Sequence, residues 1–139
     1  MVAVLILGIL AAVVVASYSR YIEQTRLVRA ISDIYSLQMT IENFLARNGN
    51  LPESLADVGE GGFRDPWGNA YQYLRVVDDG KHGKGHVRKD RSLHPVNTDY
   101  DLYSMGKDGK SASAFTAQIS QDDVVRANDG AFVGLVSDY

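Results

Sequence analysis

Cysteine is absent from the 139 residues, so the chain can form no disulfide framework, no cysteine-based zinc site and no cysteine nucleophile. Proline is scarce, and none lies between Met1 and Leu51, so nothing in that range would break a helix. Charge is missing from residues 1–19, and Arg20 is the first charged residue. The formal net charge is -3, which argues against nucleic acid as the main partner because phosphate binding needs a basic surface.

The uncharged segment, residues 1–19, has the length of a membrane span. A helix rising about 1.5 Å per residue would carry it roughly 28 Å, close to the thickness of a bilayer's hydrocarbon core. A cleaved signal peptide would begin with a basic region, and none precedes this apolar run. A buried core helix is the alternative, but the rest of the chain is too small to surround one. This segment is therefore predicted to be a retained, single-pass membrane anchor.

From residue 20 the sequence stays helical in pattern and becomes amphipathic. One row of mostly apolar residues recurs at spacings of three and four: Leu27, Ile31, Ile34, Gln38, Ile41 and Leu45. Asn48, Gly49 and Asn50, followed by Pro52, form a typical helix stop. The pattern predicts one continuous helix over residues 1–47, with an apolar half (1–19) and an amphipathic half (20–47). A globular domain is expected over residues 48–139.

Turns and short strands are predicted after the helix. Asp65, Pro66 and Gly68 stand at the first, second and fourth positions of a type I turn that also contains Trp67. Residues 70–77 are aromatic and β-branched, with Tyr71 and Tyr73 on one face, and are expected to form a strand. Residues 100–105 are a second strand candidate. Residues 131–136 are expected to form a third strand or a docked tail.

Several of these segments together resemble a known family. They are residues 8–16 (GILAAVVVA) with Tyr18 and Tyr21, residues 65–74 (DPWGNAYQYL) and residues 100–109 (YDLYSMGKDG). The chain resembles the major pseudopilins of type II secretion systems, within the wider type IV pilin family. The resemblance implies a pilin-like α+β fold, in which the second half of a long N-terminal helix packs on a small antiparallel sheet. It also implies helical polymerisation into a short periplasmic fibre that drives protein export.

Polymerisation would use the apolar half of the helix, which can move from lipid into a helix bundle because both surroundings are apolar. The residues expected there are Val4, Leu7, Gly8, Leu10, Ala11 and Val14. Ordinary transmembrane composition is the alternative explanation for the small residues among them. The sheet is expected to cover Ile31, Ile34, Leu37, Ile41 and Phe44, which leaves the other helix face for neighbouring subunits.

The beginning of the chain departs from the family pattern. Aligned on Gly8, the family's basic leader, its Phe-Thr-Leu-Ile-Glu type start and the glutamate that sets subunit register would all precede Met1. Translation of the upstream DNA is therefore expected to show them in frame. Arg20, Arg26 and Arg29 follow the apolar run and taken alone would place the C-terminus in the cytoplasm. A basic leader would restore the family's orientation, with the globular domain in the periplasm.

Calcium is the cofactor that the resemblance implies. Asp108 matches the family's DG aspartate, and Asp122 and Asp123 match a later acidic pair. Hard oxygen ligands suit Ca²⁺, which would tie together two ends of a loop in a domain without disulfides. The connection over residues 110–121 is longer than usual and carries several residues that are not ligands. A solvated loop, with Asp122 and Asp123 starting a short helix, is the alternative.

A second polar loop carries three histidines and five basic residues: His82, His86 and His94, with Lys81, Lys84, Arg88, Lys89 and Arg91. A metal site and a basic patch for DNA are both conceivable, but a solvated loop is expected. No nucleophile elbow or HExxH pair is present. The chain is therefore predicted not to be an enzyme, and the motif residues Asp65, Pro66, Trp67, Gly68, Tyr71 and Tyr73 are predicted to build the fold.

Three functions remain open at this point, and the first is favoured. They are a major pseudopilin of the secretion pseudopilus, a type IV pilin for adhesion or DNA uptake, and a membrane-anchored periplasmic domain that does not polymerise, including an anchored enzyme. The first implies an inner-membrane protein whose partners are further copies of itself, the minor pseudopilins, the inner-membrane secretion platform and the membrane, with no nucleic acid.

Overall fold

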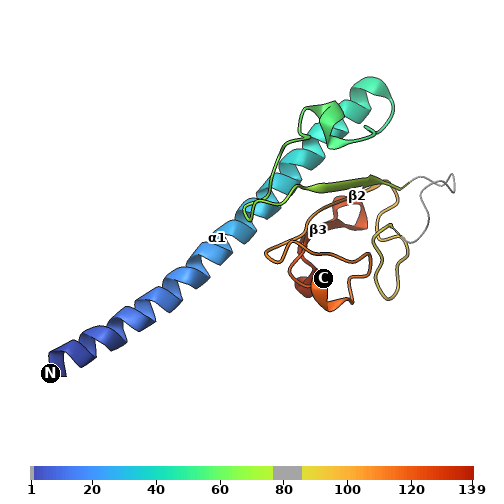
Figure 1. The fold of residues 1–139 in the computed structure, drawn as a ribbon. Helices are drawn as coiled ribbons and strands as arrows, with labels where there is room; N and C mark the ends of the chain where they lie inside the picture. Colours follow the sequence, from blue (N-terminus) through green and yellow to red (C-terminus); the bar gives the residue numbers. More distant parts are fainter. Residues whose placement is uncertain (1, 77–85) are drawn as a thin grey trace.

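The computed structural model describes residues 2–76 and 86–139, and the side chains of residues 2, 3, 5, 7 and 9–16 lie outside this description. Helix α1, Val2–Asn48, is continuous over 47 residues, which is about 70 Å of helix. Its N-terminal half projects away from a small globular part that packs on its C-terminal half (Figure 1). Gly49 ends the helix, because it adopts φ +73 and its N–H donates to the Leu45 carbonyl at 2.8 Å. The predicted continuous helix is confirmed.

Four short strands form one antiparallel sheet in the order β1-β2-β3-β4. Their bounds are Gln72–Arg75 for β1, Tyr100–Ser104 for β2, Val124–Ala127 for β3 and Phe132–Leu135 for β4. Single turns of 3-10 helix connect or flank them at Leu55–Val58 (η1), Gln118–Ser120 (η2), Asn128–Gly130 (η3) and Val136–Asp138 (η4). The predicted pilin-like α+β fold, a long helix packed on a small antiparallel sheet, is confirmed.

Strand β3 was not predicted. The sequence suggested a short helix beginning at Asp122 and Asp123, whereas the chain becomes extended at Val124. Its residues show no alternation of apolar and polar character, because both faces of the strand are buried. An arginine is normally expected at the surface, but Arg126 in this strand is only 2% exposed.

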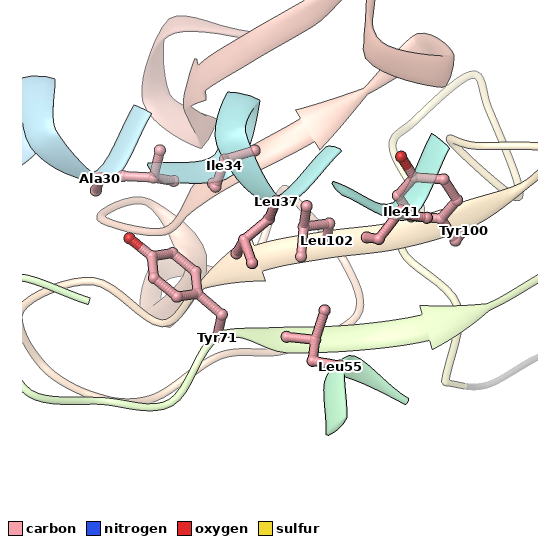
Figure 2. Packing of buried hydrophobic residues seen from close by; sticks show 9 residues of the cluster. Ala30, Ile34, Leu37, Ile41, Leu55, Tyr71, Tyr100 and Leu102 are labelled. Atoms are coloured by element: carbon pink, nitrogen blue, oxygen red, sulfur yellow. The ribbon is translucent and has the colours of Figure 1, made fainter. Parts of the chain in front are cut away.

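One face of the sheet packs against α1 and forms the larger core. Ala30, Ile34, Leu37 and Ile41 come from the helix and are at most 2% exposed. They pack with Leu55, Tyr71, Tyr100, Leu102 and Val124 from η1 and the sheet (Figure 2). Each such side chain contributes roughly 1.5–3 kcal/mol on burial. Of the other two helix residues predicted here, Ile31 packs at the edge of this core and Phe44 is half-buried.

The opposite face of the sheet is covered by loops. Val96, Phe115, Val125, Ala127 and Val136 form a second buried cluster there, with Tyr103 and Phe132 packed against it. The expectation of a solvated loop is therefore wrong for part of residues 86–99, where Val87, Arg88, Val96 and Asn97 are buried. The physical reason is that a second apolar sheet face must be covered. No long helix of the described residues covers it, so loops and the short η4, which carries Val136, do.

Candidate functional site

The outer face of α1 carries a row of exposed apolar and aromatic side chains. They are Tyr18, Tyr21, Val28, Tyr35 and Met39, each between 48% and 67% exposed, and they are called here the outer apolar face. At 100° per residue this row lies opposite the buried row that begins at Ala30. Large apolar side chains in an exposed row are typical of an interaction surface.

A shallow hollow interrupts the outer apolar face. Its lining residues are Tyr21, Gln24, Thr25, Val28, Arg29 and Ser32. The hollow is mainly apolar, although Arg29 is among its lining residues. Its shape and chemistry suit an apolar side chain of a neighbouring molecule.

All six residues predicted to mediate polymerisation lie on α1. Val4 is 73% exposed, and a Cβ atom added at Gly8 would have nothing within 4 Å. The side chains of Leu7, Leu10, Ala11 and Val14 lie outside the described residues. Within the described part of the chain, no helix combines the length and the apolar character needed to cross a membrane. The predicted anchor at residues 1–19 falls largely on side chains outside that part and stays a prediction.

The turn at Asp65 has the bonding that its sequence predicts. The Gly68 N–H donates to the Asp65 carbonyl at 2.9 Å. The Oδ1 atom of Asp65 accepts the backbone N–H groups of Trp67 at 3.0 Å and Asn69 at 2.8 Å. Asp65 is only 5% exposed, so these bonds satisfy a buried carboxylate as well as the turn.

The same turn is joined to three other parts of the molecule. The Ser104 hydroxyl at the end of β2 donates to Asp65 Oδ2 at 2.5 Å, and Asn69 Nδ2 donates to the Gly106 carbonyl at 2.9 Å. The Trp67 indole N–H donates to the Glu23 carboxylate of α1 at 3.1 Å. This last bond is the main reason why the pKa of Glu23 lies below its usual range. The turn therefore connects the helix to the second strand.

Tyr71 and Tyr73 connect the first strand region to the helix and to the loop after it. Tyr71 donates its hydroxyl proton to Asp33 Oδ2 at 3.0 Å, and burial followed by this carboxylate raises its pKa. Tyr73 donates to the Pro52 carbonyl at 2.9 Å, and burial raises the pKa of Tyr73 to about 12. Both phenols thus act as neutral donors in structural contacts.

The three carboxylates predicted to bind calcium separate into two environments. Asp122 Oδ2 accepts the backbone N–H of Asp108 at 3.0 Å, and Asp108 Oδ1 accepts the N–H of Lys110 at 2.8 Å. Asp123 is fully buried, and its Oδ2 atom instead accepts Arg88 Nη2 at 2.5 Å. Burial raises the pKa of Asp123, because it outweighs the bonds from Ser111 and Arg88.

Among residues 2–76 and 86–139, no three His, Cys, Asp or Glu side chains gather as metal ligands. The arrangement does not fit the expected calcium set, since Asp123 faces a guanidinium and not its neighbour Asp122. Calcium binding itself stays a prediction. His82, Lys81 and Lys84 of the basic loop lie outside the described residues.

Two arginines have buried structural roles that the sequence analysis missed, although it named Arg88 as part of the basic loop. Arg126 is 2% exposed and places its Nη1 and Nη2 atoms 2.8 and 2.7 Å from the two carboxylate oxygens of Asp99. Its guanidinium lies 4.1 Å from the centre of the Tyr100 ring. Arg88 has a comparable set of partners in the second core. The only sequence signal for the burial of Arg88 and Arg126 is the valine that precedes each of them, Val87 and Val125, and a single valine is a weak signal.

Comparison with known proteins gives two relatives. The chain is 29% identical to the type II secretion system core protein G of Vibrio cholerae, over 84% of this chain and 81% of that protein. It is 28% identical to the protein of the same name from Aeromonas hydrophila, over 81% of each chain. No family model matches the sequence, and no solved structure matches the fold.

Proposed function

Because the chain is homologous to core protein G of type II secretion systems, the major pseudopilin, we propose that it is a structural subunit that polymerises into a pseudopilus. Its homologues are structural pseudopilins, and this chain is likewise a structural protein and not an enzyme. The observation that supports assembly best is the outer apolar face of α1. A helix buried on one side by its own sheet, and still apolar on the other, has a second surface to bury.

The subunit would be held in the inner membrane by residues 1–19, with the globular domain in the periplasm. On assembly the N-terminal half of α1 would leave lipid for the centre of a helix bundle, at little cost because both are apolar. The outer apolar face would then contact the globular part of a neighbouring copy. The secretion partners would be the minor pseudopilins and the inner-membrane platform.

Arg88 does not fit the DNA-uptake alternative. That function required the basic loop to present its cations to solvent, and of the loop's described cations Arg91 is exposed whereas Arg88 is only 2% exposed. Its charge is neutralised inside the protein by Asp123.

The test is to place a charge on the outer apolar face in cells that carry the whole secretion system and lack the wild-type copy. Val28→Glu and Met39→Glu are expected to abolish pseudopili seen by electron microscopy and to reduce export at least about tenfold, because a buried unpaired charge costs several kcal/mol. The matched control is Ser137→Glu, which adds the same charge at an exposed position outside α1.

Normal thermal unfolding of the purified variants would show that assembly and not folding is lost. Both helix residues are more than 60% exposed, so the isolated subunit should tolerate the change within about 0.5 kcal/mol. Wild-type fibre numbers in both helix variants would rule out this face as the assembly surface.

A further inference from the structure

Three oxygen atoms of the kinds that hard cations bind lie around the Arg88 guanidinium at the second core. Its Nη2 atom lies 2.5 Å from Asp123 Oδ2. Its Nη1 atom lies 2.5 Å from both the Ser111 hydroxyl and the Ala112 carbonyl. A carboxylate, a hydroxyl and a backbone carbonyl are oxygen donors of the kind found in protein calcium sites.

The surroundings of this guanidinium suit a planar cation better than a metal ion. It lies 4.0 Å from the centre of the Tyr103 ring and 5.3 Å from that of Phe115. Aromatic faces attract a flat, weakly hydrated guanidinium, and the guanidinium fork can donate to several oxygens at once. Arg88 is 2% exposed and Asp123 is fully buried, so solvent does not weaken the pair.

The contacts of Arg88 close the same loop that a metal ion would close. They join residue 88 to residues 111 and 112 on one side and to residue 123 on the other. Backbone bonds strengthen the junction, since Lys89 donates to Ser113 and Phe115 donates to Lys89, both at 2.9 Å. The Ser111 hydroxyl also donates to Asp123 Oδ2 at 2.5 Å. Both ends of residues 110–121 are thus fixed from inside the domain.

We propose that the Arg88 guanidinium is the internal cation of this loop, and that the fold is therefore stable without a bound divalent cation. The other two carboxylates of the predicted calcium set bond to backbone groups: Asp122 accepts the Asp108 N–H, and Asp108 accepts the Lys110 N–H. Asp123 is fully buried, and its charge is paired with Arg88. This inference concerns folding and goes beyond the proposed role in assembly.

The first test compares the thermal unfolding of the full chain in detergent micelles with millimolar calcium chloride and with the chelator EGTA. The two Tm values are expected to agree within about 1 °C. A saturating ligand that the fold required would raise Tm by on the order of 10 °C in a domain of this size. A calcium-induced rise of that order would overturn the inference.

The second test removes the guanidinium. Arg88→Met keeps an apolar stem but leaves Asp123 buried without its cation, and Tm is expected to fall by more than about 10 °C with or without calcium. Arg91→Met, at an exposed position of the same loop, is the matched control and should unfold like the wild type. A Tm of Arg88→Met close to that of the control would overturn the inference.

Arg88→Lys covers the case in which the methionine variant yields no folded protein. It keeps a charge but has a single donor group, so it is expected to fold with a Tm between those of wild type and Arg88→Met and to remain indifferent to calcium. If the Tm of Arg88→Lys equalled that of the wild type, the inference that the guanidinium itself stabilises this loop would be overturned. None of these outcomes depends on fibre assembly, so the inference and the proposed function fail separately.

Discussion

Single buried polar residues join parts of this molecule that strand pairing does not join. Arg126 connects β3 to Asp99 and reaches Gln38 of α1 with its Nε atom at 3.3 Å. Asn97, fully buried, donates to both Asp101 at 2.8 Å and the Arg126 carbonyl at 3.1 Å. Groups of this kind cost free energy unless they are bonded, so each one fixes its segment in a single position.

Asp65 gives the clearest prediction at the residue scale. Its carboxylate accepts three hydrogen bonds, from Trp67, Asn69 and Ser104. Asp65→Ala would leave these donors without their acceptor and is expected to lower the free energy of unfolding by about 2–4 kcal/mol. Urea unfolding of the full chain in micelles, followed by the fluorescence of Trp67, measures the change.

Two further variants separate the bonds from the charge. Asp65→Asn keeps an oxygen for the two backbone N–H groups, and its amide can donate to the Ser104 hydroxyl, so about 1 kcal/mol or less should be lost. Asp138→Ala, at an exposed position, should change nothing measurable. Equal losses for the alanine and asparagine variants of Asp65 would show that the charge, and not the bonds, matters.

At the scale of elements, the sequence predicts the long helix and three of the four strands and misses β3. Helix α1 could be predicted because its apolar row recurs over many turns, and β2 because Tyr100, Leu102 and Tyr103 give it the aromatic and apolar composition of a strand. Strand β3 could not, since its burial depends on β2, β4 and the loops around it. The calcium prediction grouped Asp122 with Asp123 because the family resemblance implied it. In the fold Asp122 accepts the Asp108 N–H, whereas Asp123 bonds to the buried Arg88. Arg88 had only a weak local signal, because the partners of its guanidinium are 23 to 35 positions away.

The two faces of α1 should respond differently to the same loss of side-chain volume. Leu37 is 2% exposed in the core against the sheet, whereas Val28 is 66% exposed on the outer apolar face. Leu37→Ala is expected to destabilise the subunit by about 2–5 kcal/mol. Val28→Ala should stay within about 0.5 kcal/mol. Thermal unfolding of the purified subunits compares them, and equal losses would mean that the outer face is also packed in the monomer.

At the scale of the whole molecule, three tyrosines lie where the helix, the sheet and the loops meet; Tyr71 and Tyr100 are buried and Tyr73 is half-buried. Tyr71 bonds to α1, Tyr73 bonds to the loop that follows α1, and the ring of Tyr100, the first residue of β2, lies against the Arg126 guanidinium. Burial is the main cause that raises the pKa of each of them. Ionisation of any one would place a phenolate inside the larger core, so these groups couple the stability of the entire fold to alkaline pH.

The sign of that coupling follows from proton binding. An unfolded tyrosine loses its proton near pH 10, whereas the pKa of folded Tyr73 is raised to about 12. Between these values the unfolded chain binds fewer protons than the folded one, so stability, fully present below about pH 10, must fall as pH rises.

Tm measured from about pH 8 to pH 11.5 should show this decline. The Tm of Tyr73→Phe should be lower than that of the wild type at the start of this pH range, because the variant loses the bond to Pro52. Its Tm should then decline less steeply as pH rises. Tyr35→Phe, at an exposed position of α1, should follow the wild type. Equal slopes for the two variants would mean that Tyr73 ionises as freely in the fold as in the unfolded chain.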